Sequence, residues 1–162
     1  MTKSSVQAAY RTKEELQVAA VAAATDIFVD AVVTPALSRP EGLSRLLALV
    51  DLWLSYVERR VFPGGCFMVA TLSEYDSRPG PVRDALAQAR NGWLGVLERE
   101  AAAAQAVGDI APTPSAKAFA FEIDALLAAA NVSRNLSDDV AALQTARELV
   151  HLRLGSTAAN RV

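Results

Sequence analysis

The sequence has few of the residues on which most enzymes and metal sites depend. Its 162 residues include one cysteine, Cys66, and one histidine, His151. A single cysteine excludes an internal disulfide framework, and a zinc site of the usual type would have almost no ligands. The same shortage removes most Ser-His and Cys-His catalytic arrangements. We therefore expect a protein that is not an enzyme and that holds no metal and no cofactor.

The remaining candidates for chemistry have simpler interpretations. No Gly-x-Gly-x-x-Gly or Walker phosphate loop is present. Glu74 and Asp76 are two residues apart on a predicted helix, so their carboxylates point to different sides. Cys66 follows two glycines near a predicted helix start, where a thiol pKa can fall, but a free cysteine is more often a packed core residue. His151 fits the last turn of a helix, where a cation suits the dipole.

Strong charge and long apolar runs are also lacking. The formal net charge is −2, so any contact with nucleic acid would have to come from a local basic patch. No stretch is expected to span a bilayer, because polar residues interrupt the apolar runs. The first residues lack the apolar core of a signal peptide. These observations predict a soluble cytoplasmic protein.

The residues that are abundant favour helices. Apolar residues make up 52% of the chain and aromatic residues only 6%, and alanine and leucine, which are strong helix formers, dominate the apolar set. The length suits one domain with a sizeable core. Apolar residues recur at three- and four-residue spacing. Thr12, Thr113 and Ser137 are placed as helix caps, and Pro40, Pro81 and Pro114 are placed in first helical turns. We predict an all-α fold of about six main helices, over residues 13–37, 40–61, 65–76, 81–101, 115–134 and 138–155.

One short stretch stands apart from the long helices. The predicted helix 65–76 is bracketed by Pro63-Gly64-Gly65 and by Pro79-Gly80-Pro81, which both break helices. A short core helix is one interpretation. The other is an element that borders a ligand pocket and shifts as a unit. On the second interpretation, replacing Gly64 and Gly65 with alanine should change a ligand response more than it changes dimerisation.

The same stretch carries a family resemblance. The motif Val61-Phe62-Pro63-Gly64-Gly65-Cys66-Phe67, followed by Glu74-Tyr75-Asp76-Ser77-Arg78-Pro79-Gly80-Pro81-Val82-Arg83-Asp84, resembles the C-terminal domain of TetR-type (tetracycline-repressor-like) transcription regulators. In helix order and length the resemblance extends from Thr12 to Gly155. It implies a homodimeric transcription regulator, expected to be a repressor, whose C-terminal domain binds a small and mostly apolar effector.

The N-terminus resembles the recognition helix of the family's helix-turn-helix and its junction to the next helix. Residues 1–11 would be this remnant, and residues 12–162 the helical domain for ligand binding and dimerisation. The resemblance implies DNA contacts from Thr2, Lys3, Ser4, Ser5, Gln7, Tyr10 and Lys13. A helix-turn-helix also needs a first helix that holds the recognition helix in place. We therefore expect this chain, as given, to bind operator DNA poorly or not at all.

The resemblance also implies two sets of sites in the helical domain. The ligand pocket would be lined by Phe28, Trp53, Tyr56, Phe67, Met68, Leu72, Tyr75, Trp93 and Asn131. The last two long helices would pair with those of a second subunit through Phe119, Ile123, Leu126, Leu127, Leu143 and Val150. For each residue, ordinary core packing is the alternative. A different function also stays open, namely a helical protein that binds a ligand and dimerises without acting on DNA.

Overall fold

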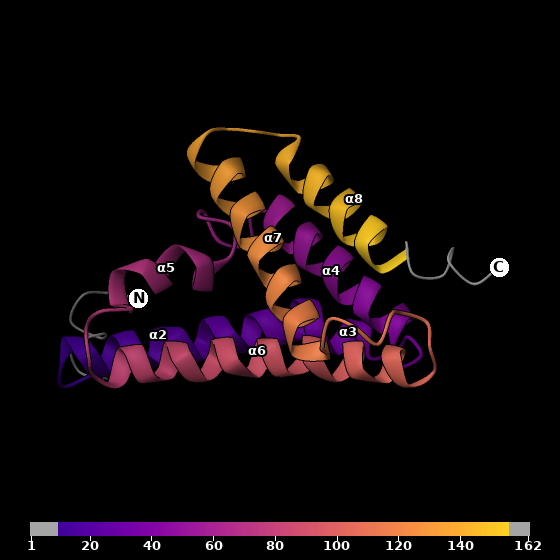
Figure 1. Ribbon diagram of the computed structural model, residues 1–162. Coiled ribbons are helices and arrows are strands. Elements are labelled where there is room, and N and C mark those ends of the chain that lie inside the picture. The colour runs from indigo at the N-terminus through magenta and orange to yellow at the C-terminus, as the bar shows by residue number, and fades with distance from the viewer. Residues whose placement is uncertain (1–9, 156–162) are drawn as a thin grey trace.

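A computed structural model describes residues 10–155, and within that range the regular elements are helical (Figure 1). One isolated bridge pairs Phe62 with Gly65. The prediction of an all-α fold is therefore confirmed. The elements are α2 (Lys13–Phe28), the π-helix η1 (Val29–Val33), α3 (Thr34–Ala36), α4 (Leu43–Glu58), α5 (Phe67–Tyr75), α6 (Pro81–Ala106), α7 (Ala116–Leu136) and α8 (Ala142–Gly155).

The first three elements form one continuous helical run that begins at a capped end. The Thr12 hydroxyl accepts a hydrogen bond from the backbone N–H of Glu15 at 3.0 Å, as a capping residue should. The Glu15 carboxylate accepts a hydrogen bond from the N–H of Arg11, the residue before the cap, at 2.8 Å. The backbone N–H of Thr34 bonds to the carbonyl of Val29, five residues earlier. Pro35 explains this wide turn, because its ring lacks an N–H and clashes with the carbonyl of the preceding turn.

The continuous run from Lys13 to Ala36 bears on the expectation that no stretch spans a membrane. Its 24 residues are long and apolar enough to cross a membrane by length and composition alone, and one 18-residue window within them has a mean hydropathy of 1.8. The interrupting polar residues are too few to exclude a span by this measure. A helix that packs inside a protein passes the same test, and α2 packs along α6. We therefore attach no membrane span to it.

The remaining helices rise from the α2–α6 pair (Figure 1). α7 packs on both α6 and α8, and α4 contacts α6, α7, α8 and η1. Most buried apolar side chains lie in one cluster between these helices. α5 lies to one side, against α6 and α7, and none of its residues is fully buried. A second and smaller cluster of Val21, Val82 and Leu86 lies near α5.

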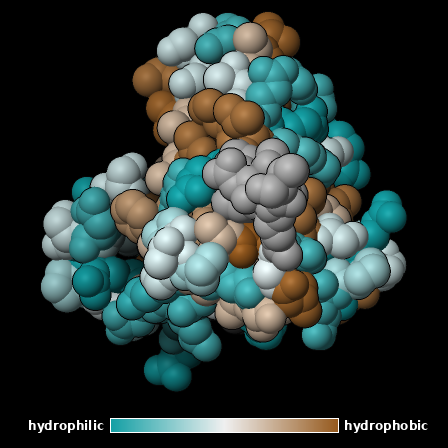
Figure 2. All heavy atoms as spheres, turned by 45° about the vertical axis from the view of Figure 1, so that its right-hand side comes forward, coloured by the Kyte–Doolittle hydropathy of each residue, from teal (hydrophilic) through white to brown (hydrophobic). Residues whose placement is uncertain are grey.

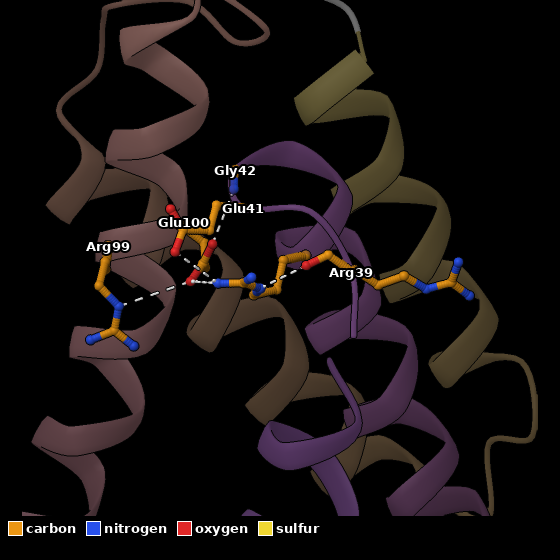
Figure 3. Close-up of polar contacts among 6 residues, drawn as sticks. Arg39, Glu41, Gly42, Arg99 and Glu100 are labelled. Carbon is orange, nitrogen blue, oxygen red and sulfur yellow. Dashed lines mark hydrogen bonds and ion pairs between the residues drawn. The ribbon is translucent and has the colours of Figure 1, made fainter. Parts of the chain in front are cut away.

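The start of α4 is fixed to α6 by a buried carboxylate (Figure 3). Glu100, which is 2% exposed, accepts a hydrogen bond from the backbone N–H of Gly42 at 3.0 Å. Its other oxygen lies 3.4 Å from Nη1 of Arg45 and 3.9 Å from Nε of Arg99. Arg45 also donates to the carbonyl of Arg39. Both charges of the buried pair are therefore compensated, which a buried ion pair requires.

Gly42 is needed at the start of α4 because its backbone has a positive φ and because there is no room for a side chain. Its φ is 89°, a conformation that side chains rarely adopt. A Cβ there would lie 3.2 Å from the backbone nitrogen of Ala104 on α6. These constraints place the start of α4 at Leu43, directly after the glycine, and not at Pro40 as predicted. The start of α7 also lies later than predicted, because Ser115 and not Thr113 is its capping residue.

The predicted start of the last helix was wrong. Ser137 ends α7 instead of capping α8, and Asp138 has a positive φ of 52°. The Asp139 carboxylate accepts from the backbone N–H of Ala141 at 3.0 Å, which forms a turn. α8 therefore begins at Ala142. Acidic residues suit turns as well as first helical turns, so the sequence signal was ambiguous.

Candidate functional site

A cavity of about 480 Å³ lies where α5 meets the other helices. Five helices contribute to its walls, together with the residues that flank α5. Its lining residues are Thr25, Phe28, Trp53, Cys66, Met68, Val69, Leu72, Ser73, Asp76, Ala89, Arg90, Trp93, Asp124 and Ala128. This volume is in the usual range for pockets that hold a small organic ligand. The lining is mainly apolar and aromatic, with a few polar groups, which is also typical of such pockets.

A second cavity, of about 620 Å³, lies along the groove between α2 and α6. It shares Thr25, Phe28, Ala89 and Trp93 with the first. The rings of Phe28 and Trp93 meet edge to face, with their centroids 5.2 Å apart. We take the first cavity as the candidate site, because more helices line it and because an ion pair lies in its wall.

The polar groups of the candidate site lie on α6 and α7. Nη2 of Arg90 donates a hydrogen bond to Oδ2 of Asp124. The Arg90 side chain is 36% exposed and that of Asp124 is 16% exposed. The pair therefore borders the cavity and remains partly in contact with solvent. Asp76, the residue that ends α5, is exposed and also lines the cavity.

Cys66 lines the cavity as a protonated thiol. The residue is 3% exposed, and burial raises the pKa of its thiol. Backbone N–H groups at the start of α5 act in the opposite direction, and the nearby charge of Asp124 raises the pKa further. The resulting pKa, above the ordinary value, matches the interpretation of Cys66 as a packed residue and disfavours a reactive thiolate.

Five of the nine predicted pocket residues lie together in the cavity wall. These are Phe28, Trp53, Met68, Leu72 and Trp93. They were named from the family resemblance, and the structure places them around one cavity. Sequence reasoning missed Arg90 and Asp124, which lie on two helices far apart in the sequence. Because the two residues pair across α6 and α7, no pattern of neighbouring residues in the sequence indicates the contact.

Four predicted pocket residues serve other contacts. Tyr56 is 1% exposed and lies beneath Phe28, with ring centroids 5.6 Å apart. Burial also raises the pKa of Tyr56. Phe67 packs on Phe62. The hydroxyl of Tyr75 accepts a hydrogen bond from Gln17 at 2.7 Å, which joins the end of α5 to α2.

Asn131, the fourth of them, anchors the start of α5. Its Oδ1 accepts from the backbone N–H of Cys66 at 2.8 Å, and its Nδ2 lies 3.3 Å from the carbonyl of Gly64. A Cβ on Gly65 would lie 2.2 Å from that same Oδ1, and the φ of Gly65 is +75°. The glycine is therefore required by packing. Replacing Gly64 and Gly65 together cannot separate a hinge from this contact.

The predicted dimer residues lie mostly inside the subunit. Phe119, Ile123, Leu127, Leu143 and Val150 are buried, and Leu126 is partly buried against the same core. Their own chain already covers these side chains, so they cannot face a second copy without opening the core. The apolar side chains that α7, α8 and their connection do expose are Phe121, Val132, Leu136, Val140, Leu149 and Leu152.

The predicted DNA contacts fall mainly outside the described residues. Thr2, Lys3, Ser4, Ser5 and Gln7 all precede residue 10, and the structure gives no account of them. Tyr10 is partly buried, and Lys13 is exposed as the first residue of α2.

Comparison with known proteins places the fold. The crystal structure of Escherichia coli NemR in its reduced form superimposes with a TM-score of 0.68 at 19% sequence identity. The match covers 94% of this chain and 80% of the NemR chain. At this identity the likeness shows the fold alone. A search of curated proteins found no match. Residues 42–150, more than half of the chain, match the family described as "Tetracyclin repressor-like, C-terminal domain". The chain therefore belongs to the tetracyclin repressor-like C-terminal domain family.

Proposed function

We propose that the chain is the effector-binding and dimerising part of a TetR-type transcription regulator, and that the effector occupies the cavity of about 480 Å³. The observation that carries the proposal is this cavity itself, whose wall combines three aromatic rings with one ion pair. The family membership supports the same assignment. The expected output is relief of repression, because an effector that binds one dimer conformation better than another shifts the population toward it.

α5 is the element best suited to respond to the effector. It contributes Met68, Val69 and Leu72 to the cavity wall, yet it has no fully buried residue. Few buried contacts mean that local displacement costs little free energy. The hydrogen bond from Cys66 to Asn131 holds the N-terminal end of α5, and Tyr75 ties its C-terminal end to α2. A ligand that displaces α5 would therefore transmit the movement to α2.

Tryptophan emission tests effector binding directly. The chain has two tryptophans, Trp53 and Trp93, and both line the cavity. A compound that enters should change their emission and raise the melting temperature in the same concentration range, because binding to the native state stabilises it. Compounds that raise the melting temperature without any change in emission would place the binding site elsewhere and contradict the proposal.

The dimer would form through the exposed apolar face of α7 and α8. Phe121, Val132 and Leu136 recur at intervals that place them on one side of α7, with exposures of 67%, 48% and 83%. Figure 2 shows apolar side chains over the upper part of the molecule, where α7 and α8 lie in Figure 1. An exposed apolar patch of this kind marks an interaction surface. Pairing two copies would give a four-helix contact.

The oligomeric state tests this surface. Replacing Phe121 or Leu136 with glutamate should convert the dimer into a monomer in light scattering, because a charge would be buried at the contact. Ile27→Glu is the matched control, since Ile27 is an apolar residue exposed on α2, away from this face. A monomeric unmodified chain, or equal loss of dimer in all three variants, would contradict the proposal.

A helical protein that binds a ligand and dimerises without acting on DNA is the alternative. Measuring the binding of this chain to a labelled DNA fragment in a gel-shift assay separates the two outputs. We expect weak binding that salt abolishes, as for contacts limited to phosphates. Tight, specific binding that resists salt would assign the regulatory output to this chain itself.

A further inference from the structure

The charges in the cavity wall indicate which kind of effector it accepts. Three charged side chains line the cavity, namely Asp76, Arg90 and Asp124. Two negative groups and one positive group leave the wall with a formal charge of −1. The charge of Arg90 is already compensated, since its guanidinium is hydrogen-bonded to Asp124. The excess charge therefore resides on the carboxylate of Asp76.

The Asp76 carboxylate is available to a ligand. Among residues 10–155, no ion pair joins this carboxylate. The nearest arginine along the chain, Arg83, donates to the backbone carbonyl of Asp76 at 3.0 Å and pairs with Asp84. The two other charged residues at this end of α5, Glu74 and Arg78, pair with each other. Asp76 thus stands at the cavity rim as an exposed acceptor.

The aromatic residues of the wall suit a positive charge as well. Phe28, Trp53 and Trp93 line the same cavity as the two acidic groups. The face of an aromatic ring attracts a cation, most strongly for tryptophan. An anion would meet the opposite situation, because its one positive partner, Arg90, already binds Asp124. Separating that pair would leave a carboxylate that is 16% exposed without its partner.

We propose that the cavity binds an amphipathic organic cation, an apolar ring body with an amine that is protonated at neutral pH. The ring body would lie against Phe28, Trp53 and Trp93, and the ammonium group would face Asp76 and the free oxygen of Asp124. This inference rests on the proposed function, because it names the ligand class of the same cavity.

Three compounds with one ring body test the sign of the charge. 1-Adamantanamine, 1-adamantanol and 1-adamantanecarboxylate are titrated into the full chain at neutral pH and physiological salt, with tryptophan emission and melting temperature as readouts. The amine should bind at least about tenfold more tightly than the carboxylate, with the alcohol between them. Equal or tighter binding of the carboxylate would overturn the cation inference and leave the effector cavity standing. No response to any of the three would contradict both proposals.

A matched pair of variants locates the interaction. Asp76→Asn should weaken binding of the amine about fivefold and leave the alcohol unchanged, because only the charged group loses its partner. Glu74→Gln removes the same charge from the same helix at a position outside the cavity, and it should change the amine affinity little. Both residues are exposed, so both variants should keep the melting temperature of the unmodified chain. Equal effects of the two substitutions, or no effect of Asp76→Asn, would overturn the inference.

Discussion

Two ion pairs on α6 are alike in composition and differ in their surroundings. Glu100 pairs with Arg45 at one end of the molecule, and Arg90 pairs with Asp124 near α5. The Glu100 carboxylate is 2% exposed and also accepts from a backbone N–H. The guanidinium of Arg90 is 36% exposed and faces a cavity. The first pair joins two chain segments, whereas the second forms part of a wall that a ligand can reach.

The different surroundings of the two pairs show how α6 can hold the start of α4 at one end and line a ligand cavity at the other. Near Glu100, Gly42 lies directly on the backbone of α6 and leaves no space. Near Arg90, α5 covers the cavity without burying any of its own residues. A displacement of α5 would therefore leave the start of α4 in place. Substitutions at the start of α4 should therefore lower the free energy of unfolding more than substitutions beside the cavity.

Glu100→Ala should have the largest effect. It removes the acceptor for Gly42 and leaves Arg45, whose side chain is 14% exposed, without its buried partner. Breaking a buried pair by removing one partner costs about 3 kcal/mol of unfolding free energy. Urea unfolding followed by far-UV circular dichroism measures this loss. Glu100→Gln is the control, because its amide oxygen can still accept from Gly42, and it should lose about half as much. A loss of unfolding free energy below about 1 kcal/mol in Glu100→Ala would show that Glu100 does not hold the start of α4 against α6.

Gly65→Ala should have the next largest effect, because it acts on the contact with Asn131 that holds the N-terminal end of α5 beside the cavity. The new Cβ would collide with Oδ1 of Asn131, and the φ of +75° disfavours any side chain. Strained backbone of this kind costs about 1–3 kcal/mol. Gly64→Ala is the matched control. Its Cβ would meet only the Cβ of Ala70, at 3.3 Å, without a positive φ. It should lose less than about 1 kcal/mol. Equal losses in the two variants would mean that the anchor at Asn131 does not set the position of α5.

The sequence predicts the helices well and the contacts between them poorly. Thr12, Pro81 and the apolar stripe of α4 mark the helices through rules that act within a few residues. The π-helical turn before Pro35 was not predicted from the sequence, since its geometry depends on how the chain absorbs the missing N–H. The start of α8 was placed too early, because Asp138 and Asp139 fit a turn and a first helical turn equally well.

In the candidate site too, the apolar residues could be predicted from the sequence, whereas the contacts of the polar residues could not. Inward-facing aromatic residues such as Phe28 and Trp93 were predictable, because burial follows helical periodicity. Asn131 was predicted to touch a ligand, yet it holds the turn before α5. A polar residue on an apolar face indicates a specific partner without identifying it. The predicted dimer residues present a related difficulty, since α7 is apolar on more than one side and the sequence does not say which side its own chain covers.

The same substitution at the two arginines compares the pairs most directly and tests the smallest effect. Arg45→Gln leaves the 2% exposed carboxylate of Glu100 without its closest cation, and it should cost about 2 kcal/mol of unfolding free energy. Arg90→Gln leaves Asp124 beside a cavity that water can enter, so it should cost less than about 1 kcal/mol, as for partly exposed ion pairs. Both are measured in the same urea unfolding experiment. Comparable losses of unfolding free energy would show that the cavity wall is as firmly fixed as the start of α4. α5 would then no longer be the element that moves at the lowest cost in free energy.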